Sequence, residues 1–399
     1  MAHLALDHAL PASWIDEVFQ AHRQRQYPRE LLFSSVVELM LLVTLGLRPS
    51  LHAAARKMAD RLPVSLAALY AKVQRTEPAV LRALVQGSAE RLVSVSGCLP
   101  ERHSLPGWQL RVFDGNHLPA SQKRLGPLRG FRGAALPGHT LVVYDPDSAL
   151  VCDIVACEDA HQSERTGAAA LIERAQPQQV WIGDRHFCTQ AILQGLAERG
   201  AGFIVREHAR HPRLRAPGPW SPSTDIDTGQ VREQVIELAE PHEGLSPPWR
   251  RIEIALHTPT DAGDRTIVLW SNLPAQIDAT TLARLYRQRW RIEGMFGRLE
   301  SVLNSEIKTL GHPRAALLGC KRSANPSFRA VMKLRTSCLG NRRTGRGGYG
   351  STACAAVHGA GGGLPCFGPE GQGLGRGQRR AAGNAGQLVR ALPALAGQA

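Results

Sequence analysis

The chain has 399 residues, of which 43% are hydrophobic, so it is long enough for two or three domains with a substantial core. Its longest apolar run, "LMLLVTLGL" at residues 39–47, is too short to cross a bilayer. With no secretory leader pattern, these features exclude membrane proteins and favour a cytoplasmic protein.

Charge and cysteine usage narrow the class of protein further. The net charge is +14, but residues 321–399 hold 12 Lys and Arg residues against one acid, whereas the preceding 320 residues hold 36 basic and 33 acidic residues. The high overall charge is therefore weak evidence for a nucleic-acid partner of the folded part. Eight cysteines lie scattered without a CxxC pair, which fits reduced thiols better than disulfides or a zinc site.

Residues 1–104 are dominated by helical patterns and form our predicted N-terminal DNA-binding region. Within it, residues 50–78 favour two helices joined by a turn at "RLPVS", with Ser65 as the N-cap of the second helix. One interpretation is a helix-turn-helix that contacts DNA. The alternative is an ordinary helical hairpin with solvated cations, and the sequence leaves both open. The cations concerned are Arg56, Lys57, Arg61, Lys72 and Arg75.

From residue 105 to 206 the pattern becomes that of an α/β domain. Strand-like runs are "QLRVFDG", "HTLVVYD", "ALVCDIVAC", "QVWIGD" and "AGFIVRE", and two helical runs, 163–176 and 189–200, separate the last three. This order, βββαβαβ, is that of a ribonuclease-H-like fold. Residues 207–278 predict a β-rich insertion, and residues 279–319 predict the helical region that completes the catalytic core, starting near Asp278 or Thr280.

Three carboxylates fall at meaningful places in this predicted core. Asp114 ends the first strand, Asp184 ends the fourth, and Glu293 lies on the helix after the insertion. In the strand order 3-2-1-4-5 the first and fourth strands are neighbours, so we expect the two aspartates side by side. Converging carboxylates repel one another unless cations hold them, and oxygen ligands favour Mg²⁺ or Mn²⁺. Two such ions can serve phosphodiester chemistry.

The helix from residue 285 to 300 carries the most specific pattern. At about 100° per residue, the polar residues Tyr286, Arg289, Glu293 and Glu300 line one stripe beside the apolar face. Tyr286, Arg289 and Glu293 reproduce the Y-x2-R-x3-E signature, and "GDRHF" reproduces the second-aspartate motif. On these residues the chain resembles bacterial DDE transposases of the insertion-sequence-four family over roughly residues 10–319.

The resemblance implies a function, a cofactor and partners. It implies cut-and-paste transposition of double-stranded DNA with two divalent ions, Mg²⁺ or Mn²⁺, performed by a homodimer that bridges two transposon ends. It implies Asp114, Asp184 and Glu293 as the catalytic metal ligands. The signature's lysine, seven residues after the glutamate, is Glu300 in this chain, so a phosphate contact by that lysine does not carry over.

The remaining candidate residues are assigned by geometry and chemistry. Arg289 and Tyr286 are expected to reach DNA phosphates beside the scissile bond. Arg185 is expected to touch phosphate or to pair with Asp184. His117 and His186 lack partners at zinc-site spacing, so local hydrogen bonds or DNA contacts are the favoured interpretation. Trp270 is interpreted as a core residue of the insertion in preference to one that stacks on a flipped base.

Three functions compete at this stage. The first is a transposase that cleaves element ends and transfers strands to target DNA. The second is a nuclease on the same fold without strand transfer. The third is a catalytically impaired remnant that only binds element ends. Residues 320–399 keep the third open, because this Gly- and Arg-rich tail has no helical or strand periodicity and is expected to be disordered or translated from a shifted reading frame.

Overall fold

The computed structural model describes residues 10–26, 30–96, 103–117, 138–159, 162–210, 212–239, 249–303, 312 and 314–318. All of them belong to one compact unit of the chain, Met1–Gly345. The predictions for the tail, 320–399, fall outside the described residues. Within the described part, no helix combines the length and the apolar character that a membrane span requires.

The N-terminal region is helical, as the sequence predicts. Its elements are α2 (Ala12–His22), α3 (Phe33–Thr44), α4 (Leu51–Lys57), α5 (Leu66–Arg75) and α6 (Pro78–Ser96), with a 3-10 turn (Ala59–Arg61) between α4 and α5. The predicted N-cap is present, since the Ser65 hydroxyl accepts a hydrogen bond from the Ala68 backbone N–H at 3.3 Å. Ser50 caps α4 in the same way.

One large mixed sheet forms the rest of the core. Its strands are β1 (Gln109–His117), β2 (His139–Asp145), β3 (Leu150–Ala156), β4 (Gln179–Gly183), β5 (Gly202–Arg206), β6 (Leu214–Pro217), β7 (Thr224–Ile226), β8 (Gly229–Leu238), β9 (Trp249–Leu256) and β10 (Thr266–Ser271). They follow the order β3-β2-β1-β4-β5-β10-β9-β8-β6, and β7 pairs with β8. The first five therefore have the predicted 3-2-1-4-5 arrangement, with β4 parallel to both β1 and β5.

The strands of the predicted insertion extend this same sheet. β10 pairs antiparallel with β5, and β9 and β8 follow outward from β10. The insertion is β-rich as expected, and its strands continue the sheet that β1 to β5 form. Because β5 is the parallel neighbour of β4, the chain that follows β5 begins near Asp184, which directly follows β4.

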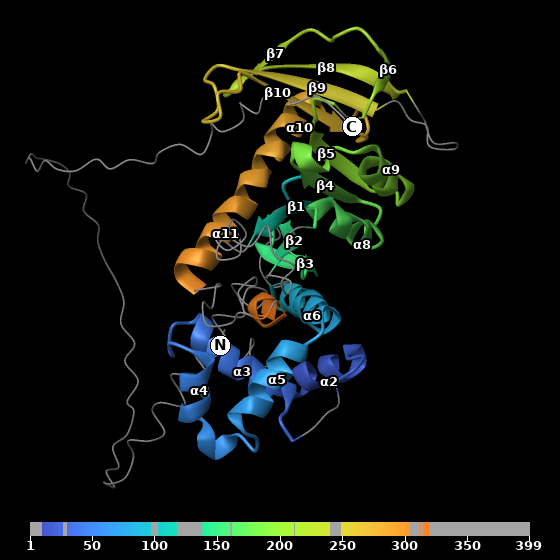
Figure 1. Cartoon of the computed structure of the whole chain (residues 1–399). Helices are drawn as coiled ribbons and strands as arrows, with labels where there is room; N and C mark the ends of the chain where they lie inside the picture. The colour runs from blue at the N-terminus through green and yellow to red at the C-terminus, as the bar shows by residue number, and fades with distance from the viewer. Residues whose placement is uncertain are drawn as a thin grey trace, which may run out of the picture. The chain divides into compact units, whose positions relative to one another are not determined.

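Helices cover both faces of the sheet (Figure 1). One face packs against α10 (Ala279–Tyr286) and α11 (Trp290–Leu303), and the other packs against α8 (Ala168–Ile172) and α9 (Gln190–Glu198). Alternation along each strand sorts the side chains. Val112 and Ile182 lie in the cluster under α10 and α11, whereas Phe113 and Trp181 lie in the cluster under α8 and α9.

The helix after the insertion begins where the sequence predicts and is then interrupted. Asp278 is the N-cap, and its Oδ1 accepts a hydrogen bond from the Thr281 N–H at 2.6 Å. A 3-10 turn, Arg287–Arg289, separates α10 from α11. Such a turn advances about 120° per residue instead of 100°, so three residues shift the projection by about 60°. Tyr286 and Arg289, three residues apart, are therefore brought closer to one direction than they would be on a regular helix.

A short helix, residues 314–318, closes the described part of the chain. Ala315 and Leu318 join the apolar cluster of the N-terminal helices, and both are buried. The Arg314 guanidinium pairs with the Glu158 carboxylate at 3.0 Å, just beyond β3. Residues 314–318 thus lie at the boundary between the helical region and the sheet.

Candidate active site

The strand register brings Asp114 and Asp184 together. β1 and β4 are parallel, with Val112 beside Ile182, and two residues further along each strand stand the two aspartates. Adjacent strands lie about 4.8 Å apart. By alternation both carboxylates project from the face that α10 and α11 cover. Gly183, directly before Asp184, leaves room for the Phe113 side chain of the neighbouring strand, because a Cβ at position 183 would lie 2.6 Å from the Phe113 ring.

Glu293 and Arg289 reach the same point from the covering helix. The Arg289 Nη1 lies 3.4 Å from the Asp114 Oδ2 and 2.7 Å from the Glu293 Oε1. Since both oxygens meet one nitrogen, they lie within about 6 Å of each other. The Arg289 side chain is only 9% exposed, whereas that of Glu293 is 41% exposed. A buried guanidinium therefore joins two of the three predicted carboxylates.

Burial and charge set the protonation of this cluster. Burial, opposed by the neighbouring Arg289, raises the pKa of Asp114 to about 6, and the nearby Asp184 and Glu164 carboxylates add to the increase. Burial also raises the pKa of the Tyr286 hydroxyl to about 12. For Arg289, burial favours a lower pKa, but Tyr286 and the surrounding carboxylates outweigh it and the pKa is raised. Arg289 is thus a permanent cation among acids.

A fourth carboxylate, which the sequence analysis missed, lies against this cluster. Glu164, in the 3-10 turn before α8, packs so closely on Gly115 that any Cβ at that position would collide with its carboxylate. Its charge contributes to the raised pKa of Asp114. The segment "SERTG" contains no motif that marks Glu164 as a site residue. The proximity of Glu164 to Asp114 arises only in the folded chain.

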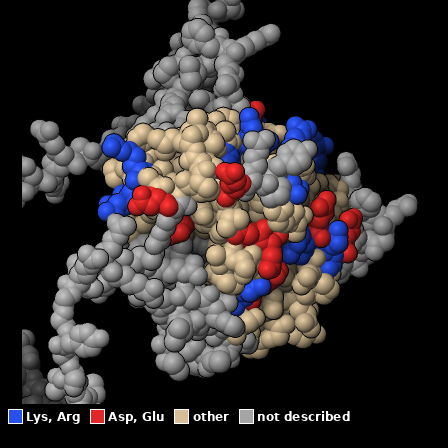
Figure 2. Space-filling model, turned by 90° about the horizontal axis from the view of Figure 1, so that it is seen from below, with Lys and Arg blue, Asp and Glu red and all other residues tan. Residues whose placement is uncertain are grey.

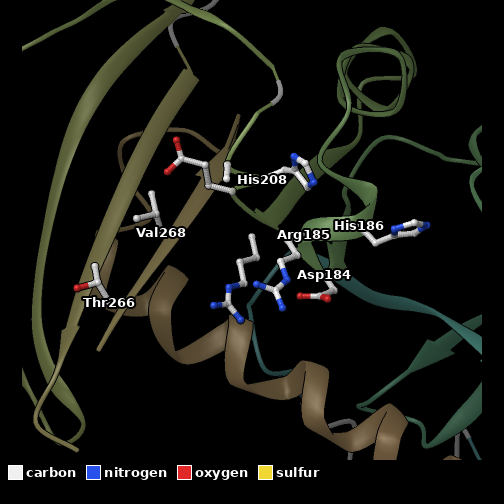
Figure 3. Close-up of a pocket in the computed structure, with 9 residues that line it drawn as sticks. Asp184, Arg185, His186, His208, Thr266 and Val268 are labelled. Carbon is white, nitrogen blue, oxygen red and sulfur yellow. The ribbon is translucent and has the colours of Figure 1, made fainter. Parts of the chain in front are cut away.

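Two cavities share a cationic wall, and Asp184 lines the first of them. One, of about 440 Å³, extends from Asp184 to β10 (Figure 3). The other, of about 590 Å³, lies between α10 and the strands of the insertion. Arg185 and Arg206 line both cavities. Arg206 ends β5 as Asp184 follows β4, so attention to every strand end could have found it.

The predicted accessory residues differ in their accessibility. Arg185 is exposed, and no ion pair among the described residues includes it. His186 points away from Asp184 and Arg185, and its backbone carbonyl accepts a hydrogen bond from Arg165 Nε at 2.6 Å (Figure 3). Tyr286 is 5% exposed yet borders the larger cavity. Trp270 is fully buried, so it is a core residue and not a base-stacking one. The side chains of His117 and Glu300 lie outside the described part.

The carboxylates suit a hard divalent cation by their chemistry. Asp114 and Glu293 already share one cationic group, Arg289, and Asp184 projects beside Asp114. Carboxylate oxygens are the ligands that Mg²⁺ and Mn²⁺ prefer. Among the described residues, however, no three acids, histidines or cysteines have converged into a metal-binding group. The cluster has the right donors, with a guanidinium between two of them.

Comparison with known proteins gives one family. The family model described as "Transposase DDE domain" matches residues 110–316, just over half of the chain. The match begins in β1 and ends in the short helix 314–318, so it includes the three carboxylates and the arginines around them. The N-terminal helices lie before the matched range. A search of curated proteins gives no match.

Proposed function

Because this chain belongs to the transposase DDE domain family, we propose that it cleaves DNA at the ends of an insertion sequence and joins the freed strands to target DNA. The observation that carries the proposal is the meeting of Asp114 and Glu293 at one buried guanidinium, beside the strand end that bears Asp184. The matched range includes all three acids, which supports their assignment as the DDE residues.

The strand order supports a finer classification. The 3-2-1-4-5 arrangement, with helices on both faces, fits a ribonuclease-H-like core. The spacing of Tyr286, Arg289 and Glu293 on the helix after a β-rich segment favours the insertion-sequence-four branch of the family. Both assignments are parts of the proposal.

In the proposed reaction, Asp114, Asp184 and Glu293 would hold two Mg²⁺ or Mn²⁺ ions. Such ions supply Lewis-acid chemistry that activates water or a 3′-hydroxyl toward a phosphodiester. Arg185, exposed at the cavity shared with Arg206, donates charge-assisted hydrogen bonds to the DNA backbone and orients it. Tyr286 borders the adjoining cavity and positions a phosphate there through its hydroxyl.

Double-stranded DNA is the proposed substrate, both as element ends and as target. Transfer of two ends requires two active sites, so we propose a homodimer in the complex that holds both ends. We propose a cytoplasmic location with access to the nucleoid, as this substrate demands. The N-terminal helices are the proposed region that recognises the element ends.

Alanine substitution tests the assignment of the catalytic acids. Asp114→Ala, Asp184→Ala and Glu293→Ala should each abolish Mg²⁺-dependent cleavage of DNA that carries the inverted repeats flanking the gene. Binding of the same DNA should remain largely intact, because phosphate contacts elsewhere dominate affinity. The measurement is a gel assay for cleavage beside an anisotropy assay for binding.

Controls separate this function from the alternatives. Asp225→Asn removes an exposed acid on β7 and should leave cleavage unchanged. Pre-cut ends with free 3′-hydroxyls should be joined to target DNA by the wild-type protein, which a nuclease without strand transfer cannot do. If the Glu293→Ala protein cleaved DNA at the rate of the wild type, the assignment of Glu293 as a catalytic acid would be wrong. If the full chain binds this DNA but does not cleave it, the protein is a catalytically impaired remnant that only binds element ends.

A further inference from the structure

Arg289 occupies an unusual position for a residue proposed to contact DNA. Its Nη1 lies between the Asp114 and Glu293 carboxylates, at 3.4 and 2.7 Å, and its side chain is 91% buried. Each of these oxygens is one that a divalent cation would need as a ligand. In this conformation the guanidinium supplies the positive charge that the carboxylates otherwise lack.

The same guanidinium is incompletely satisfied where it lies. Its Nε is buried and has no hydrogen-bond partner within the described structure. A buried donor without an acceptor costs free energy, all the more in a charged group. The carboxylate position therefore satisfies the charge of Arg289 but not its hydrogen-bonding capacity, and an alternative position with more acceptors could compete with it.

Such an alternative position lies next to the site. The Arg289 guanidinium is 4.7 Å from the centre of the Trp290 ring, and this indole is 55% exposed. Both side chains border the cavity of about 590 Å³ between α10 and the insertion. A guanidinium that swings toward this cavity can keep its contact with the ring and present Nε and both Nη atoms to acceptors from outside.

We propose that Arg289 is a built-in counter-ion of the DDE carboxylates, which must leave Asp114 and Glu293 before a divalent cation can bind there. This proposal rests on the proposed function, since it assigns the metal to the same carboxylates. When Arg289 turns toward the cavity, the phosphate oxygens of bound DNA are acceptors of the right charge and shape. The chain thus exchanges one cation for another at these carboxylates.

A binding titration tests this competition without measuring catalysis. The metal-free full-length protein is titrated with Mn²⁺, and unbound Mn²⁺ is counted by electron paramagnetic resonance. Arg289→Gln removes the competing charge, so it should bind Mn²⁺ about tenfold more tightly than wild type, which is about 1.4 kcal/mol. Arg289→Lys keeps the charge and should stay close to wild type.

Two comparisons show whether charge at this position is the cause. Arg287→Gln removes an exposed neighbour that pairs with Asp227 on the insertion, and it should leave Mn²⁺ affinity unchanged. In Arg289→Ala, free guanidinium ion at a concentration well below denaturation should weaken Mn²⁺ binding more than the same concentration of NaCl does. A merely structural arginine would show no such return of competition.

The outcomes are distinguishable from failure of the proposed function. If Asp114→Asn loses Mn²⁺ binding while Arg289→Gln binds no more tightly than wild type, the metal assignment stands and the counter-ion is overturned. If Asp114→Asn binds Mn²⁺ as well as wild type does, the metal assignment itself fails. Absence of binding in both wild type and Arg289→Gln overturns both. Circular dichroism of each variant verifies that the fold is retained.

Discussion

At the scale of single residues, the ionised carboxylate of Asp114 lowers the free energy of unfolding because it is buried. Burial raises its pKa to about 6, well above the value of about 3.9 for an aspartate in an unfolded chain. The folded protein therefore binds this proton more tightly than the unfolded one. Its free energy of unfolding must fall as the pH rises between these two values, and the loss persists above the higher one.

Asp114→Asn should consequently stabilise the metal-free protein at neutral pH. The difference between the two pKa values sets an upper limit of about 3 kcal/mol on the gain at about pH 7.5, because one pKa unit is worth about 1.4 kcal/mol. Near pH 4 the carboxyl is protonated in the folded protein, and the gain should vanish. Thermal unfolding in EDTA at both pH values measures the effect. An equal gain at both would mean that relief of packing, and not of charge, is responsible.

At the scale of elements, the cations of the α4–α5 pair differ in exposure: Arg75 on α5 is exposed as those of α4 are, but Lys72 is not. Arg56 and Lys57 are exposed on α4, whereas the Lys72 ammonium on α5 donates to the Leu31 carbonyl and lies 4.8 Å from the centre of the Phe19 ring. Burial lowers the pKa of Lys72, an effect that the charge of Asp16 opposes. Lys72 thus faces the interior of the helical region. Seen from below, basic and acidic side chains are interspersed among the described residues (Figure 2).

This difference yields a test of the helix-turn-helix hypothesis. Arg56→Gln should weaken DNA binding and reduce the slope of log affinity against log salt by about 1, as expected for one lost phosphate contact. Lys72→Met should leave that slope unchanged, because its ammonium does not face solvent freely. Fluorescence anisotropy of a labelled duplex over a salt series gives both values. If neither substitution changes the slope, the pair is an ordinary helical hairpin.

Strand-forming runs and helix-capping residues predicted much of the fold, because both depend on interactions between residues close together in the sequence. Short β-rich runs located the first five strands, and their arrangement followed from the ribonuclease-H-like strand order. The cap at Ser65 followed from a hydroxyl side chain before a helical pattern, and the sequence placed the start of the later helix near Asp278, which the structure shows as its N-cap. Pairing of β10 with β5 was not predictable, since alternation identifies a strand but not its partner. The 3-10 turn at Arg287–Arg289 was not predictable either, because it has no marker in the sequence.

The candidate site was predictable to the extent that it lies on regular elements. Asp114 and Asp184 follow from the strand ends, and Glu293 follows from the spacing on its helix. The position of Arg289 between two acids did not follow, because a pattern of residues gives a direction around a helix and not the partner that a long side chain reaches. Glu164 escaped for the same reason.

At the scale of the whole molecule, the described fold ends within a buried helix. In residues 314–318, Ala315, Leu317 and Leu318 are at most 1% exposed, so this segment is integral to the packing. The sequence beyond Gly319 then changes abruptly, with one acid and 17 glycines in residues 321–399. Such composition buries too little apolar surface to offset the entropy of the chain. An apolar helix that packs would be the expected continuation.

We therefore predict that the chain from about Cys320 onward is translated from a shifted reading frame. A coding sequence rich in G and C, read out of frame, yields Gly-, Arg- and Ala-rich text of this kind. Translating the other two frames of the gene beyond the codon for Gly319 should reveal a long continuation with helical periodicity. A protein restored to that frame should be more stable, since burial of apolar surface contributes about 25 cal/mol per Å². If neither frame gives such a helix, the basic tail is genuine, and its removal should weaken DNA binding in a salt-dependent way.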